Sequence, residues 1–535
     1  VNYTSPIGAV TRSGWGRPVE FDILIANGTV IDGSADATAR PADVGINGDR
    51  IVAVDRLDGA RANTTIDARG KVVAPGFIDV HVHSEITLLG GPHRYGSVLQ
   101  GVTTHLLAPD GFGWAPLSRD LARQFWDYRR PFVGEQAPGF SLDWTTPEAY
   151  LAIFPGNSPV NVLPQVPHCA VRLGAMGWSP RPASDDELER TKETTRAWLE
   201  AGATSLCLGL DYQPSAYADT RELIELSKIV REYGGIYAAH VRYTDLGQAR
   251  AWRETMEIGR QADIPVHISH EHVTDVTEQL LEEAAGVCDL TFESYLYPAG
   301  CTHLALMLPT WAQAGGPPGI AQSLAYPATR REMREHLRRN LLDGIARGAR
   351  AVFGATGSGR YIGMSIADAA AYEGEEIGDF AIRVLDEENP HPLMVYHLPG
   401  TADEHRRMAE RTFRHLRMLV ASDGIYHGQS GHPRGYGCFA RALRLARETR
   451  VVSLETAVHK MSGFPAERFQ ITGRGLLAPD HAADVVVFDS DRVADRATWD
   501  EPRLQPVGID RVLVNGQIVV LDGKPTGALP GHVLT

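Results

Sequence analysis

The chain has 535 residues, of which 43% are hydrophobic and 22% charged, a composition typical of a soluble globular protein. A formal net charge of −14 disfavours nucleic acid as a partner, because a phosphate backbone attracts basic surfaces. No apolar stretch of about 18 residues could span a bilayer. Residues 1–16 are polar and do not resemble a secretion signal. We therefore expect a cytoplasmic protein without membrane contact. The composition leaves open whether the chain forms a homo-oligomer.

The cysteines argue against two kinds of structure. They are odd in number and show no paired spacing, so neither a disulfide framework nor a thiolate zinc cluster is expected. The five are Cys169, Cys207, Cys288, Cys301 and Cys438. The length of the chain suffices for one large core with an accessory domain.

Both ends of the chain show the pattern of short β-strands joined by tight turns. Residues 21–67 contain apolar runs separated by turn signals such as Asn47-Gly48-Asp49. The same texture returns in residues 483–488 and 511–520. We therefore predict one small β-sandwich domain built from both termini, residues 1–70 with 472–535.

Between the two ends the pattern alternates between strand and helix. Helices are predicted at residues 184–201, 220–233 and 246–260, and strands near residues 78, 104, 162, 206, 238, 268, 292 and 420. Repeated βα units predict a parallel sheet, and eight of them close into a barrel. Residues 71–471 are therefore predicted to form an α/β fold, a TIM-like (β/α)8 barrel. An insertion near residues 301–353 is expected over its mouth, because that segment is too long for a simple connection.

Candidate metal ligands stand at the ends of the predicted strands. His81 and His83 are one residue apart, so on a strand they project to the same face in a chelating geometry. His240, His270 and Asp423 also end strand-like runs, and barrels of this type place their chemistry there. Each histidine alone is more often a packed core residue, but together they favour a metal centre. Nitrogen and carboxylate ligands suit Zn²⁺ or a similar divalent ion.

Several stretches resemble a known family. Residues 74–83, Ala-Pro-Gly-Phe-Ile-Asp-Val-His-Val-His, resemble the start of an amidohydrolase-superfamily barrel. Within that superfamily, the chain is most similar to the D-aminoacylase (N-acyl-D-amino-acid deacylase) branch. The stretches that carry this are Gly101-Val102-Thr103-Thr104, Tyr237-Ala238-Ala239-His240-Val241-Arg242, Ile268-Ser269-His270, Leu308-Pro309-Thr310-Trp311-Ala312, Ser422-Asp423-Gly424 and His432-Pro433-Arg434. The resemblance covers nearly the whole chain. It implies a metal-dependent hydrolase that cleaves the amide bond of an N-acyl amino acid, foremost an N-acyl-D-amino acid, or of a related carboxylate-bearing amide.

The resemblance also implies roles for single residues. The five metal candidates would bind one or two divalent ions, with zinc as the expected metal, and Asp423 would in addition shuttle the proton. Arg434 matches the arginine that binds the substrate carboxylate, and a guanidinium suits this role because it pairs with carboxylates in a bidentate manner. The alternative for Arg434 is a structural ion pair.

The chain departs from the family pattern at three positions. Asp110 stands where the family has a metal-binding cysteine, and its carboxylate is expected to bridge two ions; the alternative is a loop aspartate that caps a turn. His272 replaces a lysine and Cys301 a serine, whereas Tyr295 is kept. These last three residues are expected on the substrate side, with a packing role equally open for Cys301.

Two other functions stay open. A cyclic-amide hydrolase of the hydantoinase or dihydroorotase kind would share the metal ligands, but it usually bridges its ions with a carboxylated lysine. Between Val72 and Ala201 the sequence has a single lysine, Lys192, in a predicted helix. A non-catalytic barrel that serves as a binding subunit is disfavoured because every metal candidate is present.

Overall fold

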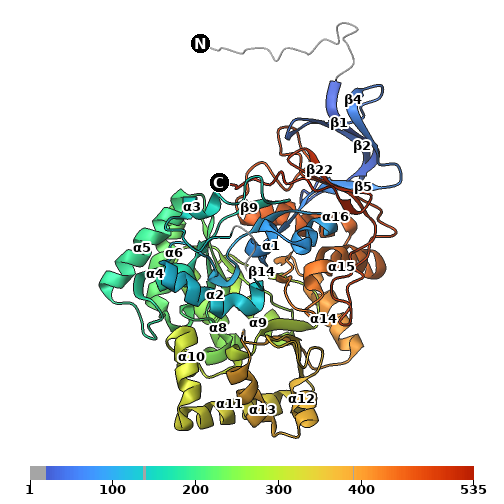
Figure 1. The fold of residues 1–535 in the computed structure, drawn as a ribbon. Coiled ribbons are helices and arrows are strands. Elements are labelled where there is room, and N and C mark those ends of the chain that lie inside the picture. Colours follow the sequence, from blue (N-terminus) through green and yellow to red (C-terminus); the bar gives the residue numbers. More distant parts are fainter. Residues whose placement is uncertain (1–19, 136–139, 390) are drawn as a thin grey trace.

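The computed structural model describes residues 20–135, 140–389 and 391–535. It contains a central barrel, a β domain and a helical insertion (Figure 1). Residues 1–16, where no secretion signal is expected, lie outside the described residues. Among the described helices, none combines the length and the apolar character needed to cross a membrane.

The central unit is the predicted (β/α)8 barrel. Its strands are β6 (Phe77–Asp79), β8 (Val102–Leu106), β9 (Asn161–Leu163) continued by β10 (Val166–Pro167), β11 (Ser205–Gly209), β12 (Ile236–His240), β13 (Val266–Ile268), β14 (Leu290–Ser294) and β18 (Met418–Val420). Each of the eight predicted strand positions falls within one of them. They form two parallel sheets, β6-β8-β9 and β10-β11-β12-β13-β14-β18. The fold class predicted from the sequence is therefore confirmed.

The ring closes where the first and last strands meet. β7 (Val82–His83) pairs in parallel with β19 (Gly424–Ile425), and the backbone N–H of Ser422 donates to Asp79 Oδ1 at 2.9 Å. On the other side, β9 and β10 are separated by only two residues, so the chain itself joins the two sheets. This closure brings the residues after β6 beside those after β18.

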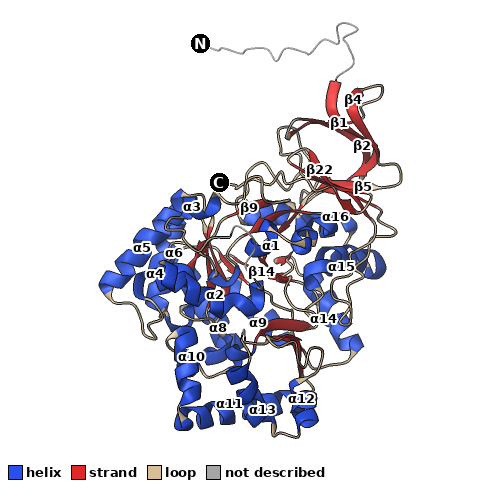
Figure 2. Ribbon diagram, viewed as in Figure 1, coloured by secondary structure: helices blue, strands red, loops and turns tan. Residues whose placement is uncertain are grey.

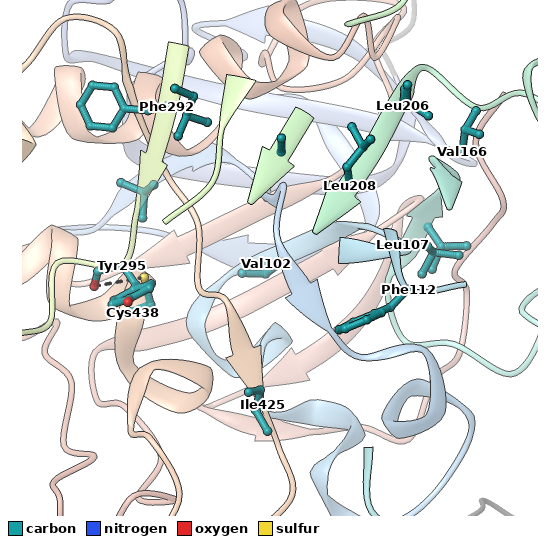
Figure 3. Close-up of a cluster of buried hydrophobic side chains, with 14 of the residues drawn as sticks. Val102, Leu107, Phe112, Val166, Leu206, Leu208, Phe292, Tyr295, Ile425 and Cys438 are labelled. Atoms are coloured by element: carbon teal, nitrogen blue, oxygen red, sulfur yellow. Dashed lines mark hydrogen bonds between the residues drawn. The ribbon is translucent and has the colours of Figure 1, made fainter. Parts of the chain in front are cut away.

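The barrel is a packed core rather than a pore. On the outside of the strands, Leu206, Leu208 and Phe292 (Figure 3) belong to a core that also contains helix residues such as Leu226. Inside the barrel, Ile78, Leu106, Leu163 and Leu419 form a separate buried cluster. Such filling by branched and aromatic residues is usual in barrels of this kind. It gives the strand ends a rigid base.

Amphipathic helices cover the outside of the barrel (Figure 2). The predicted helices are observed as α5 (Asp185–Glu200), α6 (Thr220–Glu232) and α8 (Gln248–Ala262). The helix α5 begins with a capping box, in which the Ser184 and Glu187 side chains each accept from the other's backbone N–H.

Both ends of the chain contribute to one β domain. Its strands are β1 (Glu20–Val30), β2 (Arg40–Asn47), β3 (Arg50–Asp55), β4 (Arg61–Asp67), β5 (Val72–Pro75), β20 (Val485–Phe488), β21 (Ile509–Val514), β22 (Gln517–Leu521) and β23 (Lys524–Pro525). Hydrogen bonds join all nine in one sheet. Ile25 and Val44 from the first part pack in the same core as Val485 and Leu513 from the last part, so the sheet bends around a shared interior.

The connection from β14 to β18 contains a separate small unit. Its sheet consists of β15 (Ala299–His303), β16 (Arg350–Ala355) and β17 (Leu393–His397), and its helices are α10 (Gly316–Ala325), α11 (Pro327–Ala346), α12 (Ile366–Glu373) and α13 (Ile377–Glu387). These elements share a hydrophobic core of their own that includes Leu337, Phe353 and Phe380. The segment predicted as an insertion, residues 301–353, lies within this unit.

Candidate metal centre

Three of the predicted ligands meet where the barrel closes. His81 and His83 flank Val82, and both rings are buried. Asp423, which follows β18, has its Oδ1 3.7 Å from His81 Nε2 and 3.3 Å from His83 Nε2. These three side chains together could hold a metal ion.

Asp110 lies between two sets of histidines. It sits in the short 3₁₀ turn Pro109–Gly111 that follows β8. Its Oδ2 is 3.6 Å from His83 Nε2, whereas its Oδ1 is 3.6 Å from His81 Nε2 and 4.0 Å from His270 Nε2. A second group that could hold an ion is formed by His81, Asp110 and His270. The two carboxylate oxygens of Asp110 thus face different ligands.

His240 and His270 complete the cluster from the opposite strands. His240 ends β12, and its Nδ1 is 2.9 Å from His270 Nε2. Two ring nitrogens at this distance share at most one proton, and once that proton leaves, each offers a lone pair to a metal ion. The structure therefore brings together all six residues predicted as metal ligands.

The free atoms and charges of this cluster fit a divalent metal. His81 Nε2 and Asp110 Oδ1 are buried and have no hydrogen-bond partner among the described residues, which is unusual for polar atoms in a protein interior. Burial alone would raise the pKa of Asp423, but Arg434 and the neighbouring histidines lower it to about 2. His81 and the other rings likewise hold the pKa of Asp110 well below its usual range against the effect of burial. Both carboxylates are thus ionised at neutral pH, as metal ligation requires.

Two carboxylates that the sequence reasoning missed orient these rings. Glu293, in β14, has its Oε1 3.0 Å from His81 Nδ1 and accepts from the backbone N–H of His270 at 2.9 Å. Asp211 Oδ2 lies 3.0 Å from His240 Nε2. Such partners fix which ring nitrogen faces a metal. Both carboxylates end or follow strand-like runs, so the signal that singled out His240 could have found them.

The residues predicted for the substrate carboxylate gather on one side of the centre. Arg434 begins α15 (Arg434–Thr449), is fully buried, and holds its guanidinium 4.5 Å from the centre of the Tyr295 ring. Its Nη2 is 2.8 Å from Asp423 Oδ2, and Asp423 is its one acidic partner among the described residues. His272 packs edge-on against Tyr295 and binds Ser294 Oγ through Nδ1, which leaves Nε2 without a partner in the described chain. Burial lowers the pKa of His272 to about 4, so this ring is neutral.

Cys301 joins the same side of the centre. It lies in β15, where the charges of Arg434 and Asp423 act on its thiol. Burial raises the pKa of that thiol to about 12, so it stays protonated at neutral pH. A protonated thiol is a poor nucleophile, so Cys301 is not suited to attack a ligand.

Aromatic rings line the other side. Phe132 stacks on His83 with 5.4 Å between ring centres, and Tyr212 lies 5.0 Å from His240. Phe112 contacts both Phe132 and Tyr212. The centre therefore has a cationic side, around Arg434, and an apolar aromatic side.

Known proteins resemble this chain in sequence and in fold. The model of the amidohydrolase family matches residues 64–293 and 367–520. A D-aminoacylase from Alcaligenes xylosoxydans xylosoxydans is 33% identical over 530 residues, which cover 96% of this chain and 97% of the relative. A solved D-aminoacylase with a binuclear metal centre has a TM-score of 0.79 and 31% identity, covering 96% of this chain and 100% of that one. An N-acyl-D-glutamate deacylase from Bordetella bronchiseptica, solved with zinc and a phosphonate inhibitor, has a TM-score of 0.77 at 31% identity, with the same coverage.

Proposed function

The chain belongs to the amidohydrolase family, in the D-aminoacylase branch, and we propose that it hydrolyses the amide bond of N-acyl-D-amino acids with one or two divalent metal ions. The observation that carries this proposal is the meeting of six nitrogen and carboxylate ligands beside a buried arginine. A metal centre alone would suit many hydrolases. The adjoining guanidinium adds a site for a substrate that bears a carboxylate.

The ligands divide into two overlapping sets. His81, His83 and Asp423 would hold one ion, and His81, Asp110 and His270 a second, with His240 beside His270. The donor atoms favour zinc or a similar metal. When bound, such an ion makes water available as a nucleophile at neutral pH and polarises the amide carbonyl.

Asp423 would move the proton. Its carboxylate is ionised at neutral pH, so it can accept the proton of the attacking water. It can then deliver that proton to the leaving nitrogen, which matters because an amide anion leaves poorly. General base and acid catalysis of this kind is typically worth about 10² to 10⁴ in rate.

The two sides of the centre orient the substrate. Arg434 would pair with the substrate carboxylate, and the free Nε2 of His272 can donate or accept one further hydrogen bond. The hydroxyl of Tyr295 would stabilise negative charge on the carbonyl oxygen. Phe132 and Tyr212 offer an apolar surface to the acyl group or the side chain.

The alternatives have less support. Lys192, the one lysine between Val72 and Ala201, lies on the outer helix α5 and pairs with Glu189 and Glu225, so it cannot supply a bridging carbamate at the centre. No feature of the centre favours a non-catalytic barrel. The cytoplasmic location and the domain limits stay predictions.

An activity screen tests the proposal. Metal-replete enzyme would be assayed with paired D- and L-N-acyl amino acids and with cyclic amides, with Asp423→Asn as the blank. We expect hydrolysis of N-acyl-D-amino acids, at a rate about 10² to 10⁴ lower in the blank. Activity restricted to cyclic amides would favour the hydantoinase-like alternative. A metal analysis that finds no divalent ion would favour the non-catalytic one.

A further inference from the structure

The loop that carries Asp110 has an unusual backbone. Ala108 and Asp110 both adopt left-handed conformations, with φ of 60° and 55°, and Gly111 follows with φ of 74°. Residues with a Cβ atom enter this region only at an energetic cost. Two such residues within three positions persist only where the surroundings enforce them.

A buried ion pair holds this loop at both ends. Glu85, which begins α1 (Glu85–Leu89), accepts a hydrogen bond at Oε1 from the backbone N–H of Ala108 at 3.0 Å. Arg129, in α2 (Arg119–Val133), donates from Nη1 to the carbonyl of Phe112 at 3.2 Å. Arg129 Nη2 lies 3.7 Å from Glu85 Oε2, and each side chain has 0% of its surface exposed. The pair therefore connects the residue two before Asp110 with the residue two after it.

Close packing removes the remaining freedom of the loop. The Arg129 guanidinium lies 4.7 Å from the centre of the Phe112 ring and 4.8 Å from that of Trp114. At Gly111 a Cβ atom would come within 2.8 Å of the carbonyl oxygen of Cys207, so the turn also fits tightly against β11. The backbone of the loop that carries Asp110 is thus held by Glu85 and Arg129, neither of which is a proposed metal ligand.

We propose that Glu85 and Arg129 are positioning residues that hold Asp110 so that its two oxygens serve two metal positions. This inference rests on the proposed function, because it takes the cluster to be a metal centre. A gain in fold stability does not explain why this position has an ion pair, since a buried ion pair is on average no more stabilising than apolar residues of similar volume. What the pair does provide is a fixed anchor at each end of the loop.

Manganese binding tests the positioning role without any assay of activity. Metal-free protein would be titrated with Mn²⁺ by calorimetry, and the loaded samples recorded by electron paramagnetic resonance. For the wild-type protein we expect two equivalents and the spectrum of a coupled ion pair. In Glu85→Gln the second equivalent should bind about 10- to 100-fold more weakly, as is usual when a group behind a metal ligand is changed. The coupled spectrum should give way to that of isolated ions.

A double variant separates positioning from stability. Glu85→Leu with Arg129→Met removes both charges together, so most of the stability should be kept while both backbone anchors are lost. We expect this folded variant to show the same weakened second equivalent. Asp484→Asn is the control, because it breaks a buried ion pair with Arg474 in the β domain and should leave manganese binding unchanged.

Each outcome decides a different statement. The positioning role is wrong if the folded double variant binds two equivalents of manganese as tightly as the wild type. It is also wrong if the wild type binds a single ion whose affinity the variants do not change. In both cases the proposed function stands. A wild-type protein that binds no divalent ion would contradict the proposed function and this inference with it.

Discussion

Arg434 and Asp423 form an ion pair inside the barrel mouth, with Arg434 Nη2 2.8 Å from Asp423 Oδ2. The other oxygen of Asp423, Oδ1, faces His83 at 3.3 Å. The residue proposed to bind the substrate carboxylate therefore touches the residue proposed to move the proton. A substrate carboxylate that pairs with the Arg434 guanidinium would compete with Asp423 for that cation. Substrate binding and proton transfer therefore both depend on the charge of Arg434.

Replacement of Arg434 should weaken substrate binding more than it disturbs the metal. In Arg434→Met we expect KM for N-acyl-D-amino acids to rise about 10- to 100-fold, because a hydrogen bond to a charged group is worth about 1.5–3 kcal/mol. Metal content should stay close to that of the wild type. Steady-state kinetics together with metal analysis measure both.

Arg441→Met is the matched control for this change. Arg441 lies on the same helix, α15, but stacks on Tyr297 and pairs with Asp495 away from the centre. It should leave KM near the wild-type value. If Arg434→Met kept the wild-type kcat/KM on every acidic amide, Arg434 would be a structural ion-pair residue instead.

Replacement of Asp423 should act on the chemical step. In Asp423→Asn we expect kcat to fall by about 10² to 10⁴, because an amide side chain neither accepts nor delivers the proton. Metal content must be measured in the same samples, since Asp423 is also a proposed ligand. Asp495→Asn, which changes a carboxylate buried outside the centre, should keep kcat. An unchanged kcat in Asp423→Asn would exclude this residue as the proton shuttle.

The identity of residue 110 should determine how many ions bind. Asp110→Asn replaces a carboxylate with a neutral amide, so we expect one divalent ion to be lost after reconstitution. Asp110→Cys restores an anionic ligand and should keep zinc, but bind manganese more weakly because a thiolate prefers softer metals. Metal analysis after reconstitution with each ion distinguishes the variants. Two tightly held ions in Asp110→Asn would show that Asp110 does not bridge.

The sequence predicts the barrel, and it selects candidate ligands that the fold brings together, for a physical reason. In a parallel sheet the residue that ends each buried strand lies at the same edge, so one rule placed His81, His240 and His270 together. The apolar runs that mark those strands are local, and so are the capping signals that mark the helices between them. No contact between distant segments is needed to recognise either.

The supporting contacts could not be predicted in this way. Glu85 and Arg129 pair across two helices, and neither residue carries a pattern that names its partner. Glu293 is found at a strand end, but its role depends on His81, which is distant in the sequence. The small unit around β15, β16 and β17 likewise depends on pairings between separated segments. Such contacts are fixed only by the tertiary structure.

A buried ionic cluster around Glu222 should make stability depend on pH. Glu222, in α6, pairs with Arg172 of α4 (His168–Met176), and its Oε1 is 3.1 Å from His168 Nε2. Burial alone would raise the pKa of Glu222, but the hydrogen bond with His168 and the charge of Arg172 lower it to about 2 from 4.5. The folded state thus binds this proton less readily than the unfolded chain. The resulting stabilisation, about 3 kcal/mol, is fully present above pH 4.5 and is lost as the pH falls toward 2.

The variant Glu222→Gln tests this dependence. It leaves the Arg172 charge buried without its acidic partner, so we expect the free energy of unfolding at pH 7 to fall by about 3–5 kcal/mol. The difference from the wild type should narrow as the pH is lowered from 4.5 to 3, because Glu222 then binds a proton in the unfolded wild-type chain but not in the folded one, which lowers the wild-type free energy of unfolding. Urea unfolding at several pH values measures the free energy of unfolding of both proteins. Glu257→Gln is the control, since the Glu257 pair with Arg260 is exposed and should contribute little at any pH. A difference that stays constant from pH 7 to 3 would show that the charge of Glu222 is not what stabilises the fold.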